Sequence, residues 1–285
     1  MAIIAEQLYV LRDRRCEEID VYSTADYRLL RRINLDDLKA DSTVSRPTDI
    51  KTYLDMVSCP VKKYLYLLRS SSIQRTDLLG NIAQSDISGF DACGISVAPN
   101  CNLIVSGRRS TGRYDGKKQV YIEWDWKASK ILREVELKIG NPVQYLLSHP
   151  LHVSNGHVVM YCGTGCYGTS CHGIYLVHTG QNQVDTGDRN SYGTDSGSSV
   201  GRLSSPCHMS VDSDTGCIFV ADSDNRRVVL LSHSLLFLRY ITDGMRDYAL
   251  SLKRVCFDSA TRRLYVGMYD SGGVLKVLQF CGVAR

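Results

Sequence analysis

The sequence predicts an all-β fold, a six-bladed β-propeller built from four-stranded antiparallel blades. Three observations carry this prediction. Apolar and polar residues alternate with a period of two in several segments, which is typical of strands with one buried face. Short clusters of turn-forming residues separate these segments. Related apolar triplets recur along the whole chain, which indicates a repeated structural unit.

The alternation is clearest in VYIEWDWK at 120–127, where the even positions are apolar and the odd positions are mostly polar. This pattern predicts a strand that buries one face. Clusters rich in glycine, asparagine, aspartate and serine follow at short intervals, at 98–102, 114–118, 212–216 and 258–263. They predict the turns between strands.

The repeat has four parts, which we assign to the four strands of a blade. A second-strand triplet occurs at 8–10, 65–67, 103–105, 158–160, 218–220 and 264–266. A third-strand segment follows each, at 18–22, 72–76, 120–124, 173–177, 228–232 and 274–278. Fourth strands are clear at 29–33, 131–135 and 238–241. Inner strands are predicted at Asp49-Ile50, 94–97, His152-Val153, 208–211 and 254–257.

We therefore expect one propeller domain over residues 1–285. Its predicted blades are approximately 1–46, 47–90, 91–141, 142–205, 206–250 and 251–285. The first unit lacks room for an inner strand before Leu8, and the last lacks a fourth strand after Phe280. Because an open sheet edge is a pairing hazard, residues 1–5 are predicted to join the last blade and close the ring. The alternative is that upstream sequence supplies the missing strand.

Composition narrows the functional classes. The chain has 285 residues, 44% of them hydrophobic and 22% charged, with a net charge of +4. This mild basicity does not indicate a dedicated nucleic-acid-binding arm. No apolar run approaches the roughly 18–20 residues of a membrane span, and charges begin too early for a signal peptide. Eleven cysteines, an odd number, argue against a disulfide framework. We expect reduced thiols and a cytoplasmic protein without membrane contact.

Residues 206–231, PCHMSVDSDTGCIFVADSDNRRVVLL, resemble an NHL repeat. The resemblance rests on a proline, an inner strand ending in Val-Asp, a glycine turn, Ile-x-Val-Ala-Asp and Asn-x-Arg-Val. Segments 94–107 and 254–267 resemble it less closely. NHL propellers occur in tripartite-motif ubiquitin ligases, where they bind proteins or RNA, and in peptidyl-hydroxyglycine amidating lyase. The resemblance implies a propeller alone, so that any ligase activity would come from a partner.

Within this segment Asp222, Asn225 and Arg227 are expected to hold the turn between the second and third strands, because they follow the repeat pattern. The alternative is an acid–base pair or a phosphate contact. Arg226 falls outside the pattern and is predicted to face a partner.

A basic cluster marks the third blade as a candidate binding face. Its residues are Arg108, Arg109, Arg113, Tyr114, Lys117 and Lys118. Arginine and lysine beside an aromatic ring can grip phosphate and stack a base, so RNA is one predicted ligand. A solvated loop tip is the simpler interpretation. Tyr167, in the loop 162–172, is a further predicted contact, and the glycine- and serine-rich loop 185–201 is a candidate rim.

Two sets of residues raise the question of a metal. Cys162, Cys166, Cys171 and His172 offer zinc-binding atoms, but their spacing differs from standard zinc-finger spacing, so incidental cysteines are favoured and zinc stays an alternative. His152 and His208 share one register and are predicted to line a channel mouth with Asp49 and Arg254. The amidating lyase binds zinc through histidines of different blades, but a third matching histidine is missing here and Arg254 would repel a cation.

The predicted function is a non-catalytic, monomeric protein-interaction platform without a cofactor, with a role in substrate recognition for ubiquitin ligation as the family resemblance implies. An RNA-binding propeller and a metal-dependent lyase are the alternatives. The sequence assembles no set of nucleophile, base and orienting residue.

Overall fold

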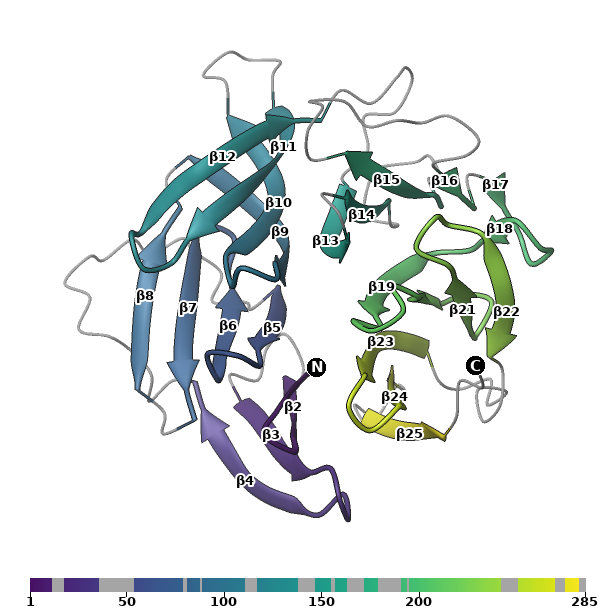
Figure 1. Ribbon diagram of the computed structural model, residues 1–285, viewed down its shortest axis with the longest axis horizontal. Helices are drawn as coiled ribbons and strands as arrows, with labels where there is room; N and C mark the ends of the chain where they lie inside the picture. The colour runs from purple at the N-terminus through teal and green to yellow at the C-terminus, as the bar shows by residue number, and fades with distance from the viewer. Residues whose placement is uncertain are drawn as a thin grey trace.

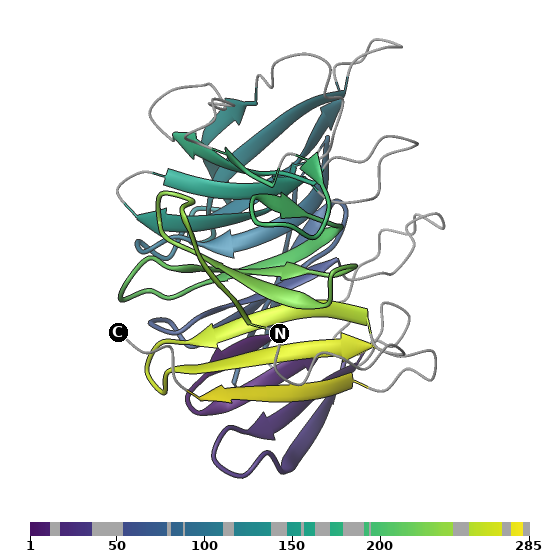
Figure 2. The same ribbon diagram turned by 90° about the vertical axis from the view of Figure 1, so that its right-hand side faces the viewer.

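The structure, a computed structural model, describes residues 1–11, 18–35, 54–78, 81–87, 89–110, 117–137, 147–154, 157–162, 172–178, 191–193, 195–241, 251–269 and 275–281. Figure 1 shows β-sheets arranged in a ring, and Figure 2 shows the same ring from the side. Among the described residues, no helix is long and apolar enough to cross a membrane.

Each blade is an antiparallel sheet whose strands pair in sequence order. The first blade comprises β1 (Ala2–Ile4), β2 (Gln7–Leu11), β3 (Glu18–Ser23) and β4 (Leu29–Asn34). The second comprises β5 (Asp55–Cys59), β6 (Tyr64–Leu68), β7 (Ser72–Asp77) and β8 (Ile82–Asp86). The third comprises β9 (Phe90–Val97), β10 (Leu103–Ser110), β11 (Lys117–Asp125) and β12 (Lys130–Glu136).

The second half of the chain continues this pattern. The fourth blade comprises β13 (Leu147–Ser154), β14 (His157–Cys162), β15 (Ile174–His178) and β16 (Ser191–Tyr192). The fifth comprises β19 (Pro206–Val211), β20 (Ile218–Asp222), β21 (Arg227–Leu231) and β22 (Phe237–Ile241). A short parallel pair, β17 (Asp195–Ser196) and β18 (Arg202–Leu203), precedes the fifth blade. The C-terminal sheet has β23 (Ser251–Asp258), β24 (Arg263–Tyr269) and β25 (Leu275–Cys281).

The position of a strand in its blade explains its composition. Strands β20 and β21 are buried along their whole length, because the fifth blade is packed between the fourth blade and the C-terminal sheet. Strand β4 is exposed at nearly every residue, since it forms the outer edge of its blade. The sequences of these two middle strands are accordingly continuous apolar runs, at 218–221 and 228–231.

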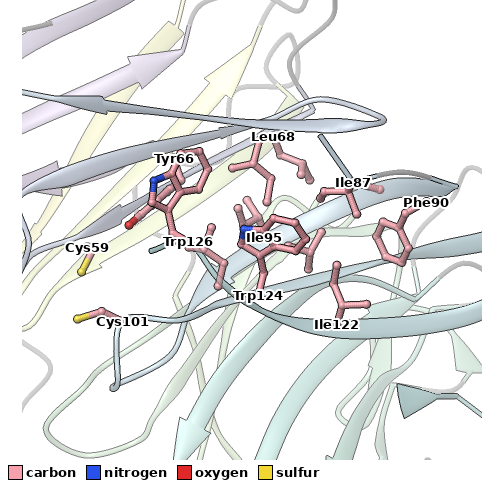
Figure 3. Packing of buried hydrophobic residues seen from close by; sticks show 14 of the residues in the cluster. Cys59, Tyr66, Leu68, Ile87, Phe90, Ile95, Cys101, Ile122, Trp124 and Trp126 are labelled. Atoms are coloured by element: carbon pink, nitrogen blue, oxygen red, sulfur yellow. The ribbon is translucent and has the colours of Figure 1, made fainter. Parts of the chain in front are cut away.

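The core consists of apolar clusters between successive sheets. The cluster between the second and third blades is the largest of these in the described residues and includes Tyr66, Trp124 and Trp126 (Figure 3). Met1, Leu8 and Val10 of the first blade pack against Tyr265 of the C-terminal sheet. The inner strands contact one another in the order β1, β5, β9, β13, β19, β23 and back to β1. Side-chain packing therefore closes the ring.

The predicted number of four-stranded blades is wrong. The described residues form five four-stranded blades, not six, and the remaining antiparallel sheet, β23–β25, has three strands. The sequence already lacked a recognisable fourth strand after Phe280. The C-terminal sheet packs against its two neighbouring sheets through residues of β23 and β24. A fourth, outer strand in this sheet is therefore not needed for these contacts.

Two further strand assignments are corrected. Residues 1–5 do not join the last sheet, because Ala2–Ile4 pairs with β2 within the first blade. Ala5 and Glu6 both have positive φ, 48° and 60°, which is the backbone of a two-residue hairpin turn that neither residue type signals. The inner strand of the second blade is β5, not Asp49-Ile50, because a hairpin across Pro60–Lys63 joins it to β6. Asp49 lies outside the described residues.

Candidate functional site

The described part of the basic cluster is largely paired with acids. Arg109 of β10 makes a two-pronged ion pair with Glu134 of β12, with Nε–Oε1 and Nη2–Oε2 distances of 2.8 and 2.6 Å. Its guanidinium also lies 5.8 Å from the centre of the Phe90 ring. Lys118 of β11 pairs with Glu136 at 2.7 Å. Two of the predicted phosphate-binding cations therefore already have carboxylate partners.

The structure describes the other residues of that cluster only in part. Arg108 is half-buried and has no ion-pair partner within the described ranges. Lys117 lies in β11, but the structure does not describe its side chain. Arg113, Tyr114 and Tyr167 lie outside the described residues altogether. The glutamates were visible in KILREVE at 130–136, but only the pairing of β11 with β12 places them beside the cations.

The acid–amide–arginine segment of the fifth blade forms a buried clamp. Arg227 Nε donates to Asp222 Oδ2 at 2.7 Å, and both side chains are buried. Asn225 Nδ2 donates to the same oxygen at 2.8 Å. The Arg227 guanidinium lies 3.9 Å from the centre of the Tyr240 ring. These residues hold the turn between β20 and β21, as the repeat pattern predicted.

The clamp also fixes the segment that enters the fifth blade. Arg227 donates to the carbonyl oxygens of Ser198 and Arg202 at 2.5 and 3.0 Å, and Asn225 donates to that of Gly197 at 2.7 Å. Burial raises the pKa of the Asp222 carboxyl, against the opposing hydrogen bonds from its partners. Because Nε, Nη1 and Nη2 of Arg227 all donate to groups within the fold, this cluster is structural. Arg226 is half-exposed in the same turn, with φ of 50°.

The inner strands carry a polar junction that differs from the predicted channel mouth. Arg254 of β23 reaches across to β5, where Nη1 lies 3.5 Å from Asp55 Oδ1 and Nη2 donates to the Leu54 carbonyl oxygen at 3.0 Å. Asp55 Oδ2 also accepts from the Ile95 amide at 3.2 Å. His208 is buried, and its Nδ1 accepts from the Val255 amide at 3.4 Å. The side chain of His152, in β13, is not described.

Asp55 was missed by sequence reasoning. Asp55 is the first residue of β5, and its ion-pair partner Arg254 lies about two hundred residues further along the chain. No local spacing in the sequence therefore links the two residues. The available signal was the hairpin itself, since the apolar triplet at 65–67 requires an inner strand a few residues before it. The junction joins three sheets: Arg254 belongs to the C-terminal sheet, Asp55 to the second blade and Ile95 to the third blade.

The candidate zinc set is not assembled by the described residues, in which no group of three or more metal-binding side chains occurs. His172 is buried, and its Nδ1 accepts from the Ser205 amide at 2.9 Å. This bond occupies one of the two ring nitrogens that could bind a metal. Cys162 lies in β14 with its side chain not described, and Cys166 and Cys171 lie outside the described residues.

Two thiols of the inner strands are poor nucleophiles. Burial raises the pKa of Cys207 in β19 and of Cys256 in β23 to about 11. The Cys207 thiol donates to the Leu252 carbonyl oxygen at 3.2 Å. Because the thiolate is the reactive form, the raised pKa lowers the reactivity of these two groups near neutral pH.

Exposed apolar side chains gather on the outer strands. Most large exposed apolar residues within the described ranges lie on or directly before β4, β12 and β22, namely Leu29, Leu30, Ile131, Leu132, Leu236 and Leu238. Figure 1 shows these three strands at the outer rim of the ring. Each also carries arginine, at Arg31 and Arg32, Arg133 and Arg239. The three outer strands thus present similar mixed surfaces of leucine or isoleucine with arginine.

The junction between the fifth blade and the C-terminal sheet predicts a loss of stability in acid. Asp212 is buried and accepts from Thr215 and Arg262, each at 2.6 Å. Burial alone would raise the pKa of Asp212, but hydrogen bonds from Thr215, Arg262 and Ser259 together lower it. A carboxyl whose pKa is lowered by folding stabilises fully above its unfolded value of about 3.9. That contribution is lost as the pH falls through the folded pKa.

We therefore expect Asp212→Asn to be less stable than the parent by roughly 1–3 kcal/mol at pH 7 and to approach it as the pH falls through the folded pKa of Asp212. Urea unfolding between pH 2 and 7 measures both curves. Asp214→Asn, in the same turn but exposed, is the control and should follow the parent. Parallel curves for the parent and Asp212→Asn would contradict the assignment.

No protein-family model matches this sequence, and no curated protein matches it. Solved structures do. A protein of unknown function from Bacteroides caccae is 12% identical, with 97% of this chain and 94% of that chain covered and a TM-score of 0.62. The Myceliophteria thermophila Cps50 (Swd1) β-propeller domain is 9% identical, with 97% and 81% covered and a TM-score of 0.57. A chain of the mitotic checkpoint complex is 12% identical, with 93% and 71% covered and a TM-score of 0.53. At these identities the likeness concerns the fold, and the chain is a β-propeller.

Proposed function

We propose that this propeller is a non-catalytic protein-interaction platform that binds partners through its outer strands β4, β12 and β22. The carrying observation is the recurrence of exposed leucine or isoleucine beside arginine on all three. The buried cores of protein interfaces are more apolar than the rest of the surface, and interfaces are enriched in arginine and depleted of lysine and glutamate. A single exposed leucine is ordinary, whereas the same combination on three outer edges supports a binding role.

The polar groups of the described residues support a binding role over catalysis. His208 and His172 each accept a backbone amide through Nδ1, and the Asp222–Arg227 pair is enclosed in the fifth blade. These contacts give both histidines and the ion pair a structural role in joining neighbouring segments. The similar chain from the mitotic checkpoint complex belongs to a multiprotein assembly, and this use of the fold also supports the proposal.

The partner class follows from the charges. Because Arg109 and Lys118 are paired with Glu134 and Glu136, the third blade presents a mixed surface, which favours a protein over RNA. The NHL resemblance of 206–231 extends the proposal to substrate recognition in ubiquitin ligation, with the ligase activity supplied by a partner. Zinc and lyase chemistry gain no support from His172 and His208.

The test compares partner capture by the whole chain and by a surface variant. Leu30→Asp, Leu132→Asp and Leu238→Asp together place a charge on each outer strand. We expect roughly a tenfold or greater loss of captured proteins, measured by quantitative mass spectrometry. Val61→Asp is the matched control, because Val61 is 80% exposed but lies in the turn between β5 and β6. It should retain every partner.

Nuclease treatment separates protein from RNA partners. Capture that persists after RNA is digested and disappears with the triple variant supports the proposal. Capture that is abolished by nuclease would favour RNA, and equal capture by the triple variant and the parent would remove the outer strands from the binding surface. Melting temperatures near that of the parent would show that the three exposed substitutions leave the fold intact.

A further inference from the structure

Two cysteines face each other across the interface between the second and third blades. Cys59 ends β5, and Cys101 lies in the turn between β9 and β10. Figure 3 shows both sulfur atoms at the same end of the apolar cluster, pointing toward one another. Both are free thiols, and both belong to that one cluster. The juxtaposition joins two cysteines that are separated by four strands in the sequence.

The nearness of the two thiols also affects their ionisation. Burial raises the pKa of the Cys59 thiol, the neighbouring Cys101 thiol raises it further, and the Lys62 backbone amide and ammonium group lower it. The side chains are buried, but each lies just beneath an exposed turn, at 60–63 and at 99–100. The pair is therefore close to solvent at the end of the interface.

Nearby aromatic and cation–π contacts pack the second blade against the third. The Tyr66 and Trp126 rings lie 5.6 Å apart, centre to centre, across the same interface. The Arg75 guanidinium lies 4.3 Å from the Tyr64 ring centre and 5.3 Å from the Trp126 ring centre. A bond between the sulfur atoms would thus join surfaces that are already packed, and disulfides form where the backbone need not move.

We propose that Cys59 and Cys101 are a modification site that forms a reversible disulfide between the second and third blades, with a small-molecule disulfide such as glutathione disulfide as the oxidant. The Cys101 thiolate, the more exposed of the two, attacks one sulfur of the oxidant and releases one glutathione thiol. The Cys59 thiolate then attacks the Cys101 sulfur and releases the second. Two protein thiols are oxidised, two protons leave with the products, and one glutathione disulfide is reduced to two thiols.

The test uses the full chain with glutathione disulfide. After free thiols are blocked, tryptic digestion without reductant should yield a peptide containing Cys59 linked to the peptide 76–108. Fragmentation assigns the link to Cys101, because Cys93 lies in the same peptide. We expect the oxidised protein to melt roughly 5–10 °C above the reduced protein, and dithiothreitol to reverse the shift.

Single variants make the assignment specific. Cys59→Ala and Cys101→Ala should each lose both the linked peptide and the temperature shift, whereas Cys93→Ala should keep them. The mapping on the parent chain decides even if a variant fails to fold. A parent that carries glutathione on Cys101 without a link to Cys59, or that links Cys59 to another cysteine, overturns the proposal, as does a parent in which neither cysteine reacts.

Discussion

Replacing Arg227 with alanine is expected to lower the free energy of unfolding by about 3–5 kcal/mol, the usual cost of breaking a buried ion pair from one side. The Asp222 carboxylate would stay buried without its cation or take up a proton, and both outcomes are unfavourable. The carbonyl oxygens of Ser198 and Arg202 would also lose their donors. The segment that enters the fifth blade would be released together with the turn.

Urea unfolding of the parent and the variant measures this loss. Lys118→Ala is the control, because the Lys118–Glu136 pair is exposed, with side chains 53% and 43% accessible. Exposed pairs contribute roughly 0–1 kcal/mol. If Arg227→Ala costs no more than Lys118→Ala, the clamp is not structural, and a functional role for Asp222 and Arg227 would regain support.

Sequence reasoning succeeded for this clamp because the repeat fixes the spacing of its members. Asp222, Asn225 and Arg227 lie within six residues of one another, so their roles follow from local geometry. Their carbonyl partners in 197–202 were not predicted, because nothing in the sequence pairs that connection with this turn. The strands of the blades followed from alternation and recurrence for the same reason, since both are local signals.

The errors arose where the determining contact is distant or the turn is atypical. The first inner strand forms through a turn at Ala5 and Glu6, residue types that do not signal positive φ. Asp55 and Arg254 meet only because the ring closes. The ion pairs of Arg109 with Glu134 and of Lys118 with Glu136 were likewise not predicted, because the sequence does not fix the register of the strands that brings them together.

Replacing Phe219 with alanine is expected to destabilise the protein by about 3–5 kcal/mol, as large-to-small changes of buried phenylalanine do. The Phe219 side chain is fully buried in β20, and its ring stacks on Phe257 of β23 with centres 4.5 Å apart. This stack joins the fifth blade to the three-stranded C-terminal sheet. Hydrogen exchange should therefore accelerate most at the amides of β23 and β24.

A double-mutant cycle with Phe257→Ala separates the stack from simple burial. Stacked aromatic pairs contribute about 0.5–1.5 kcal/mol beyond the area that they bury, so the two substitutions together should cost less than the sum of their separate effects by that amount. Phe219→Leu, which retains most of the apolar volume, should lose less than Phe219→Ala. Fully additive costs, or exchange that accelerates equally at β6 and β7, would show that this interface does not hold the C-terminal sheet in the ring. The closing contacts of Leu8 and Val10 with Tyr265 would then carry that role.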